Sequence, residues 1–207
     1  MDRFGPDFVP SQIKSLAARG ARIGLLGGSF NPAHAAHLHI SLIALRRLRL
    51  DAVWWLVSPQ NPMKPTSGMA PLARRLEQAR KIARHPGIHV SSVEAALNTN
   101  YSVDTVRALQ SRFFKARFVW LMGGDSLANF HFWRRWQDIL HHIPVAVVAR
   151  PGFTIAALAS PAAVRFRAAQ VHDGALFSML APPAWIFLQE QLDPMSATTI
   201  RRHGGWP

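Results

Sequence analysis

Short apolar runs alternate along the chain with longer stretches in which apolar and polar residues recur at helical spacing. The apolar runs predict strands at residues 23–26, 52–57, 88–90, 116–122, 144–149 and 185–188. The intervening stretches predict helices at 11–19, 35–50, 71–84, 103–113 and 196–202, and a tryptophan-rich segment at 130–136 that continues into a helix up to about residue 141. Residues 153–169 are rich in alanine and lack a clear period, so no element is assigned to them.

This alternation predicts an α/β fold with a mostly parallel sheet and helices on both faces. We expect one domain over residues 21–207, preceded by an N-terminal extension at 1–20. In such sheets, ligands bind beyond the carboxyl ends of the strands, near the reversal of strand order. The polar loops at 27–37, 59–64 and 123–125 each follow a predicted strand. These loops are therefore expected to meet at one edge of the sheet.

Composition narrows the class of protein. The chain has 207 residues, of which 49% are hydrophobic, so it can form one globular α/β domain. It contains no cysteine, which excludes disulfides and cysteine-ligated zinc. It also lacks an apolar run of membrane-spanning length, and its first 20 residues have no apolar signal core, so we expect a cytoplasmic protein. The net charge of +13 indicates either a generally arginine-rich surface or a polyanionic partner.

The stretch after the first strand carries the clearest chemistry. The strand is expected to end at Gly27 and Gly28, where the backbone can turn and approach a ligand. Pro32 closes the loop, and His34 and His37 lie at the start of the next helix. A helix N-terminus offers N–H groups to phosphate, and residues three apart project to the same side. The alternative is a plain turn with two surface histidines.

A second candidate phosphate site lies near the C-terminus. Ser196 is a suitable N-cap for the predicted helix, and Arg201 carries a guanidinium that can bind phosphate in a forked geometry. The alternative is an ordinary capped helix with basic residues at its end.

Several segments resemble known enzymes. Residues 27–37, G-G-S-F-N-P-A-H-A-A-H, resemble the phosphate-binding H-x-x-H signature of the nucleotidyltransferase superfamily, and residues 195–201, M-S-A-T-T-I-R, resemble its I-S-S-T-x-I-R element. The segments 62–64 (P-M-K), 100–105 (N-Y-S-V-D-T), 123–126 (G-G-D-S) with Trp133, and 150–152 (R-P-G) resemble bacterial nicotinate-nucleotide adenylyltransferases. The resemblance spans residues 22–203 in the family's order.

The resemblance implies a Rossmann-like, doubly wound fold and an enzyme of NAD biosynthesis. It would join the AMP moiety of ATP to nicotinate mononucleotide, with Mg²⁺ held mainly by ATP phosphates and no protein metal ligand. The implied catalytic residues are His34, His37, Lys64 and Arg201. The implied ATP contacts are Gly27, Gly28, Ser29, Phe30, His34, His37, Gly123, Asp125, Ser196, Thr198 and Arg201. The implied mononucleotide contacts are Asn31, Lys64, Tyr101, Ser102, Trp133 and Arg150.

Some points stay open at this level. Ala36, Met63 and Ala197 depart from the family pattern without removing a fixed charge. Asp125 would bind ribose hydroxyls or, alternatively, cap the following helix. The substrate could instead be nicotinamide mononucleotide or phosphopantetheine. A basic nucleic-acid-binding module is an alternative of another class, although the scattered cations and the glycine and histidine loop argue against it. The sequence leaves a homo-oligomer open.

Overall fold

The computed structural model describes residues 11–59 and 68–189. Its centre is a seven-stranded sheet in which every pair of neighbouring strands is parallel. The strands are β1 (Arg22–Gly28), β2 (Ala52–Val57), β3 (Ile88–Ser91), β4 (Arg117–Gly123), β5 (Val145–Val148), β6 (Gln170–Val171) and β7 (Trp185–Leu188). Their order, β3-β2-β1-β4-β5-β7-β6, reverses between β1 and β4. The predicted doubly wound parallel sheet is therefore confirmed.

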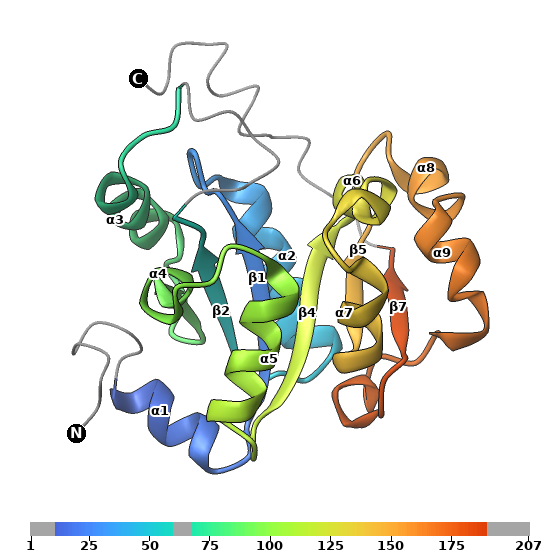
Figure 1. Ribbon diagram of the computed structural model, residues 1–207, viewed down its shortest axis with the longest axis horizontal. Helices are drawn as coiled ribbons and strands as arrows, with labels where there is room; N and C mark the ends of the chain where they lie inside the picture. The colour runs from blue at the N-terminus through green and yellow to red at the C-terminus, as the bar shows by residue number, and fades with distance from the viewer. Residues whose placement is uncertain (1–10, 60–67, 190–207) are drawn as a thin grey trace.

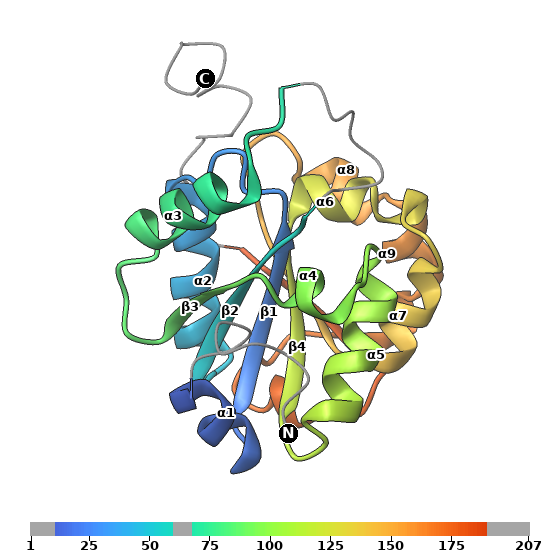
Figure 2. The same cartoon turned by 60° about the vertical axis from the view of Figure 1, so that its left-hand side comes forward.

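Helices cover both faces of the sheet (Figure 1). They are α1 (Ser11–Ala18), α2 (Ala35–Arg47), α3 (Leu72–Ile82), α4 (Val93–Leu97), α5 (Ser102–Arg112), α6 (Gly124–Ala128), α7 (Trp136–His142), α8 (Thr154–Leu158) and α9 (Pro161–Arg165). Three 3₁₀ turns are η1 (Phe130–Phe132), η2 (Arg167–Ala169) and η3 (Phe177–Met179). Figure 2 shows α2 and α3 on one side of the strands and α5 and α7 on the other.

The strands are buried on both faces, as their continuous apolarity predicted. In β2, Trp54 and Leu56 pack under α4 and α5, whereas Val53 and Trp55 pack under α2 and α3. Alternate residues of a strand point to opposite faces, so β1, β2, β4, β5 and β7 each contribute to two cores. Trp54, Trp55 and Trp120 are all buried in the core. Ala17 of α1 is also buried in the core, although it precedes the expected domain boundary.

Several predicted boundaries were wrong for local reasons. The helix predicted to reach residue 50 ends at Arg47, because Arg49 adopts a left-handed conformation with φ of 49°. The helix predicted at 103–113 begins one residue earlier, at Ser102, and Tyr101 is its N-cap. The tryptophan-rich stretch is divided into η1 and α7 by Arg135, which has φ of 53°.

Other elements were not predicted at all. The unassigned stretch 153–169 forms α8, α9 and η2, and the short elements α4, α6 and β6 are too brief to show a period. The helix predicted at 196–202 lies outside the described residues.

One carboxylate lies buried beneath the carboxyl edge of the sheet. Glu94 of α4 accepts hydrogen bonds from the side chains of Ser58, after β2, and Thr105 of α5. Burial raises the pKa of Glu94 from its ordinary value of 4.5 to about 7, and the two hydrogen bonds only partly oppose this shift. Glu94 therefore joins three elements and is partly protonated near neutral pH.

We expect Glu94 to lower stability as the pH rises. Between about pH 4.5 and 7 the folded chain retains the Glu94 proton and the unfolded chain has lost it, so the free energy of unfolding falls across this window. Glu94→Gln cannot ionise, and should gain on the order of 3 kcal/mol relative to the natural protein between pH 4 and 8. Urea unfolding at several pH values measures this difference.

The matched control is Glu77→Gln on α3, whose carboxylate is exposed and paired with Lys81. It should show no comparable gain over the same window. A constant difference between Glu94→Gln and the natural protein at every pH would contradict the prediction.

Candidate active site

The loop after β1 turns later than its glycines suggested. Both Gly27 and Gly28 still belong to β1, and the left-handed residue is Phe30, with φ of 46°. A Cβ on Gly27 would lie 2.8 Å from Cη2 of Trp120 in the neighbouring strand β4. Gly27 is therefore needed for packing against an indole. The prediction that the strand ends at these glycines is confirmed, since β1 ends at Gly28, but the left-handed turn comes two residues later, at Phe30.

The two histidines are brought together at the start of α2. His34 is its N-cap, with an extended backbone, and His37 is its third residue. Their ring centroids are 4.0 Å apart, and the His34 backbone N–H donates to Nδ1 of His37 at 3.2 Å. Because Nδ1 accepts, a neutral His37 ring carries its proton on Nε2, where it can donate to a phosphate oxygen. The predicted histidine pair at a helix N-terminus is confirmed as an arrangement.

An aromatic cluster packs against His37. The buried Phe30 ring lies 4.6 Å from the His37 ring and 5.1 Å from the Trp55 ring, centroid to centroid, and the Trp55 and His37 rings are 5.8 Å apart. The indole N–H of Trp55 also donates to Oγ of Ser41, which donates to the carbonyl oxygen of His37. The Phe30 ring thus supports His37, and the contact of Phe30 with ATP stays a prediction.

Asn31 and Arg75 attach this loop to the segment that leads into α3. The Asn31 side chain donates to the carbonyl of Gly68 at 2.9 Å and accepts from the N–H of Ala70 at 3.1 Å. The mononucleotide contact implied for Asn31 is not tested by this arrangement. Arg75, which the sequence reasoning missed, donates to four backbone carbonyls around the same loop. The available signal was an arginine on the apolar stripe of α3, three residues after Leu72.

Two further candidate residues pair across the end of β4. Asp125 lies in the first turn of α6, and its carboxylate accepts a hydrogen bond from Arg150, which follows β5. A Cβ on Gly123 would lie 2.6 Å from Oδ1 of Asp125, so this glycine makes room for the carboxylate. Asp125 makes no side-chain cap of α6. The contacts of Asp125 with ribose and of Arg150 with the mononucleotide stay predictions.

The candidate ring-binding residues lie on the other side of β4. Trp133 packs edge-on against Trp120 and Phe130, with centroid distances of 6.2 and 5.2 Å. Tyr101 precedes α5 and lies under the Arg134 guanidinium, whose central carbon is 4.5 Å from the ring centroid. Arg134 directly follows Trp133 in the chain, so its contact with Tyr101 holds the start of α5 beside the Trp133 loop.

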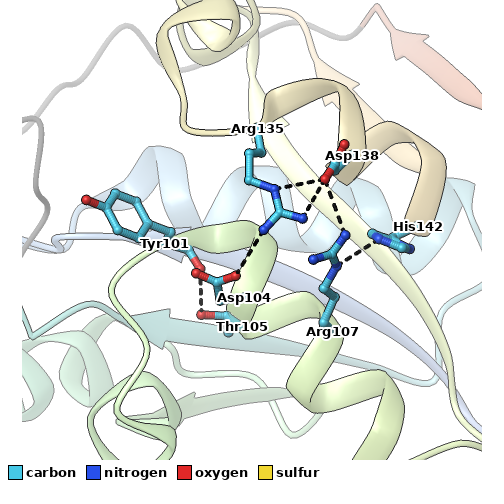
Figure 3. A network of polar contacts seen from close by, with 7 residues as sticks. All are labelled: Tyr101, Asp104, Thr105, Arg107, Arg135, Asp138 and His142. Carbon is cyan, nitrogen blue, oxygen red and sulfur yellow. Dashed lines mark hydrogen bonds and ion pairs between the residues drawn. The ribbon is translucent and has the colours of Figure 1, made fainter.

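A polar network fixes that neighbourhood (Figure 3). Arg135 donates to Asp138 at 2.7 Å and lies 3.9 Å from Asp104 on α5. Arg107 donates to the same Asp138 carboxylate and to Nε2 of His142. The network joins α5 to α7, so Ser102, the first residue of α5, is held with its helix N-terminus near the Trp133 loop. Asp104 lies in the first turn of α5 and takes part in this network.

The remaining implied site residues, Lys64, Ser196, Thr198 and Arg201, lie outside the described residues. Within residues 11–59 and 68–189, no three histidine, aspartate or glutamate side chains gather as a metal site. No helix of that part of the chain is long and apolar enough to cross a membrane.

Comparison with known proteins agrees with this geometry. The family model described as cytidylyltransferase-like matches residues 25–203. A probable nicotinate-nucleotide adenylyltransferase of Parvibaculum lavamentivorans is 53% identical over 195 residues, which are 93% of this chain and 97% of the relative. A protein of the same name from Cereibacter sphaeroides is 51% identical over 184 residues, covering 89% of this chain and 98% of that one.

The fold is also found in a solved structure. Plasmodium falciparum nicotinic acid mononucleotide adenylyltransferase, complexed with NaAD, aligns with a TM-score of 0.67 over 88% of this chain and 83% of that chain. The two sequences are 14% identical, so this match supports the fold alone.

The sequence matches span most of the chain. The chain therefore belongs to the cytidylyltransferase-like family, alongside relatives named as nicotinate-nucleotide adenylyltransferases.

Proposed function

We propose that this protein transfers the adenylyl group of ATP to nicotinate mononucleotide, giving nicotinate adenine dinucleotide and pyrophosphate. The observation that carries the proposal is the pair of His34 and His37 at the N-terminus of α2, beside the reversal of strand order. A ligand of such a sheet binds at this reversal, and a helix N-terminus favours phosphate. The named activity of relatives at 53% and 51% identity supports the same reaction.

The reaction needs alignment and charge stabilisation more than proton transfer. An oxygen of the mononucleotide phosphate attacks the α-phosphorus of ATP, and the bond to the oxygen that bridges to the β-phosphorus breaks as pyrophosphate leaves. The attacking phosphate is already anionic, so it requires no general base. His34 and His37 would donate to phosphate oxygens as their charge is redistributed in the transition state. Lys64 and Arg201 would neutralise further negative charge.

Mg²⁺ is the proposed cofactor. When bound, it neutralises phosphate charge and favours departure of pyrophosphate. A Mg²⁺ ion usually keeps several waters and takes its other ligands from substrate phosphates, so it needs no all-protein cage. The donor groups near the two histidines are imidazoles and backbone N–H groups, which suit the phosphates rather than the ion.

The second nucleotide would lie across β4 from the first. The helix N-terminus at Ser102 can receive the nicotinate carboxylate, and the Trp133 ring can stack on the pyridine. Gly123 and Asp125, where β4 passes into α6, would contact the ribose and phosphate groups. This placement favours a pyridine mononucleotide over phosphopantetheine.

We expect pyrophosphate and a dinucleotide to form when the protein is mixed with ATP, Mg²⁺ and nicotinate mononucleotide. Nicotinamide mononucleotide should react more slowly, since a neutral amide gains less from the N-terminus of α5. Coupled detection of pyrophosphate, with chromatography of the dinucleotide, measures both reactions. No turnover with either mononucleotide would overturn the proposed function.

Replacement of His37 should separate catalysis from binding. We expect His37→Ala to lower kcat by about 100- to 1,000-fold, a loss of the size seen when one transition-state donor is removed. Its Kd for ATP should rise far less, because the interaction strengthens in the transition state. Steady-state kinetics and calorimetric titration with a non-hydrolysable ATP analogue measure the two effects.

His39→Ala is the matched control, since residues two apart on a helix do not face each other. Its kcat should stay near that of the natural protein. Equal losses of kcat and ATP affinity in His37→Ala would show that His37 only binds.

A further inference from the structure

The Arg75 guanidinium lies directly beyond the last hydrogen bond between the β1 and β2 segments. The last bond between the two segments joins the N–H of Ser58 to the carbonyl of Gly28 at 2.9 Å. The next carbonyls along the two segments, those of Ser29 and Ser58, accept hydrogen bonds from Nη1 of Arg75 at 2.6 and 2.7 Å. Nη2 donates to Pro59 at 2.8 Å. The guanidinium thus continues the pairing of the two segments beyond the sheet.

The same side chain also reaches its own helix entrance. Nε of Arg75 donates to the carbonyl of Ala70 at 2.9 Å, just before α3. Asn31 binds the backbone of the same entrance through Gly68 and Ala70. Arg75 and Asn31 therefore hold the β1 loop on both sides of Phe30, the ring that contacts His37.

We propose that Arg75 is a positioning residue of the reaction: it joins the loops after β1 and β2 to α3 and so fixes His37 at the reacting phosphates. This inference rests on the proposed function. Arg75 itself is 1% exposed and touches no reacting atom by its described contacts. Its effect passes through Ser29 and Phe30 to the imidazole.

The chemistry of the contact explains why arginine is used. All four bonds of the guanidinium go to carbonyls, and none of the described acidic side chains bonds to it. A buried cation without a carboxylate is costly unless hydrogen bonds replace its hydration, and these bonds use four of the five N–H donors, so an apolar residue would serve better if packing were the only need. Leu72 and Ala79, on the same face of α3, are apolar residues that pack against this core. Lysine has three donors on one nitrogen and cannot reproduce the planar fork.

The test compares Arg75→Ala and Arg75→Lys with Arg22→Ala. Arg22 lies at the opposite end of β1 and pairs with Asp51 at 2.8 Å, so its loss weakens the fold away from the site. We expect kcat to fall about 100-fold in Arg75→Ala and at least about 10-fold in Arg75→Lys, as for a displaced catalytic group. Arg22→Ala should keep its kcat when assayed below its unfolding temperature.

Two measurements distinguish positioning from general stability. Guanidinium ion, added below its denaturing range, should restore part of the kcat of Arg75→Ala, whereas urea and NaCl should not. Hydrogen exchange of the backbone amides at 28–31, 33–38 and 58 should accelerate in Arg75→Lys and stay unchanged at 145–148.

A normal kcat or unchanged loop exchange in Arg75→Lys would overturn the inference, as would activity losses matched by Arg22→Ala. If the natural protein forms no dinucleotide, the proposed function fails separately. The exchange comparison then decides by itself whether Arg75 holds the loops.

Discussion

The backbone groups left unpaired at the carboxyl edge of a parallel sheet are the constraint on which this structure depends. Each strand ends its ladder there, and every buried carbonyl or N–H beyond it needs another partner. The chain supplies these partners from side chains and helix ends: Arg75 for carbonyls after β1 and β2, and Asn31 for the entrance to α3. The N–H groups at the start of α2 and α5 remain directed to the same edge, and there they suit anions.

The residues around this edge divide into two groups. One surrounds His34 and His37 and is supported by Phe30 and Trp55; the other surrounds Trp133 and the start of α5 and is supported by the network of Arg135 and Asp138. Strand β4 lies between them, and its end carries the ion pair of Asp125 and Arg150. Two nucleotides that exchange an adenylyl group require such neighbouring sites.

Much of the fold could be predicted from the sequence, because strands buried on both faces are continuous apolar runs. Short elements such as α4 and β6 could not, since a few residues show no period. In the site, the histidine pair followed from local spacing. The pairings of Arg75 with Ser29 and of Arg150 with Asp125 span 46 and 25 residues, and no local pattern records them. The packing need for Gly27 could not be predicted either, because it is set by Trp120, on another strand.

The hydrogen bonds of Arg75 to the two loops also affect which substitutions the site can accept. Its acceptors are main-chain carbonyls, which every amino acid carries, so it constrains the path of the two loops and not the identity of their side chains. Substitutions at Ser29 can alter what this loop recognises while the guanidinium keeps its backbone path. Where this arginine is retained, the side chains of the loops can therefore change with the substrate while their backbone path stays the same.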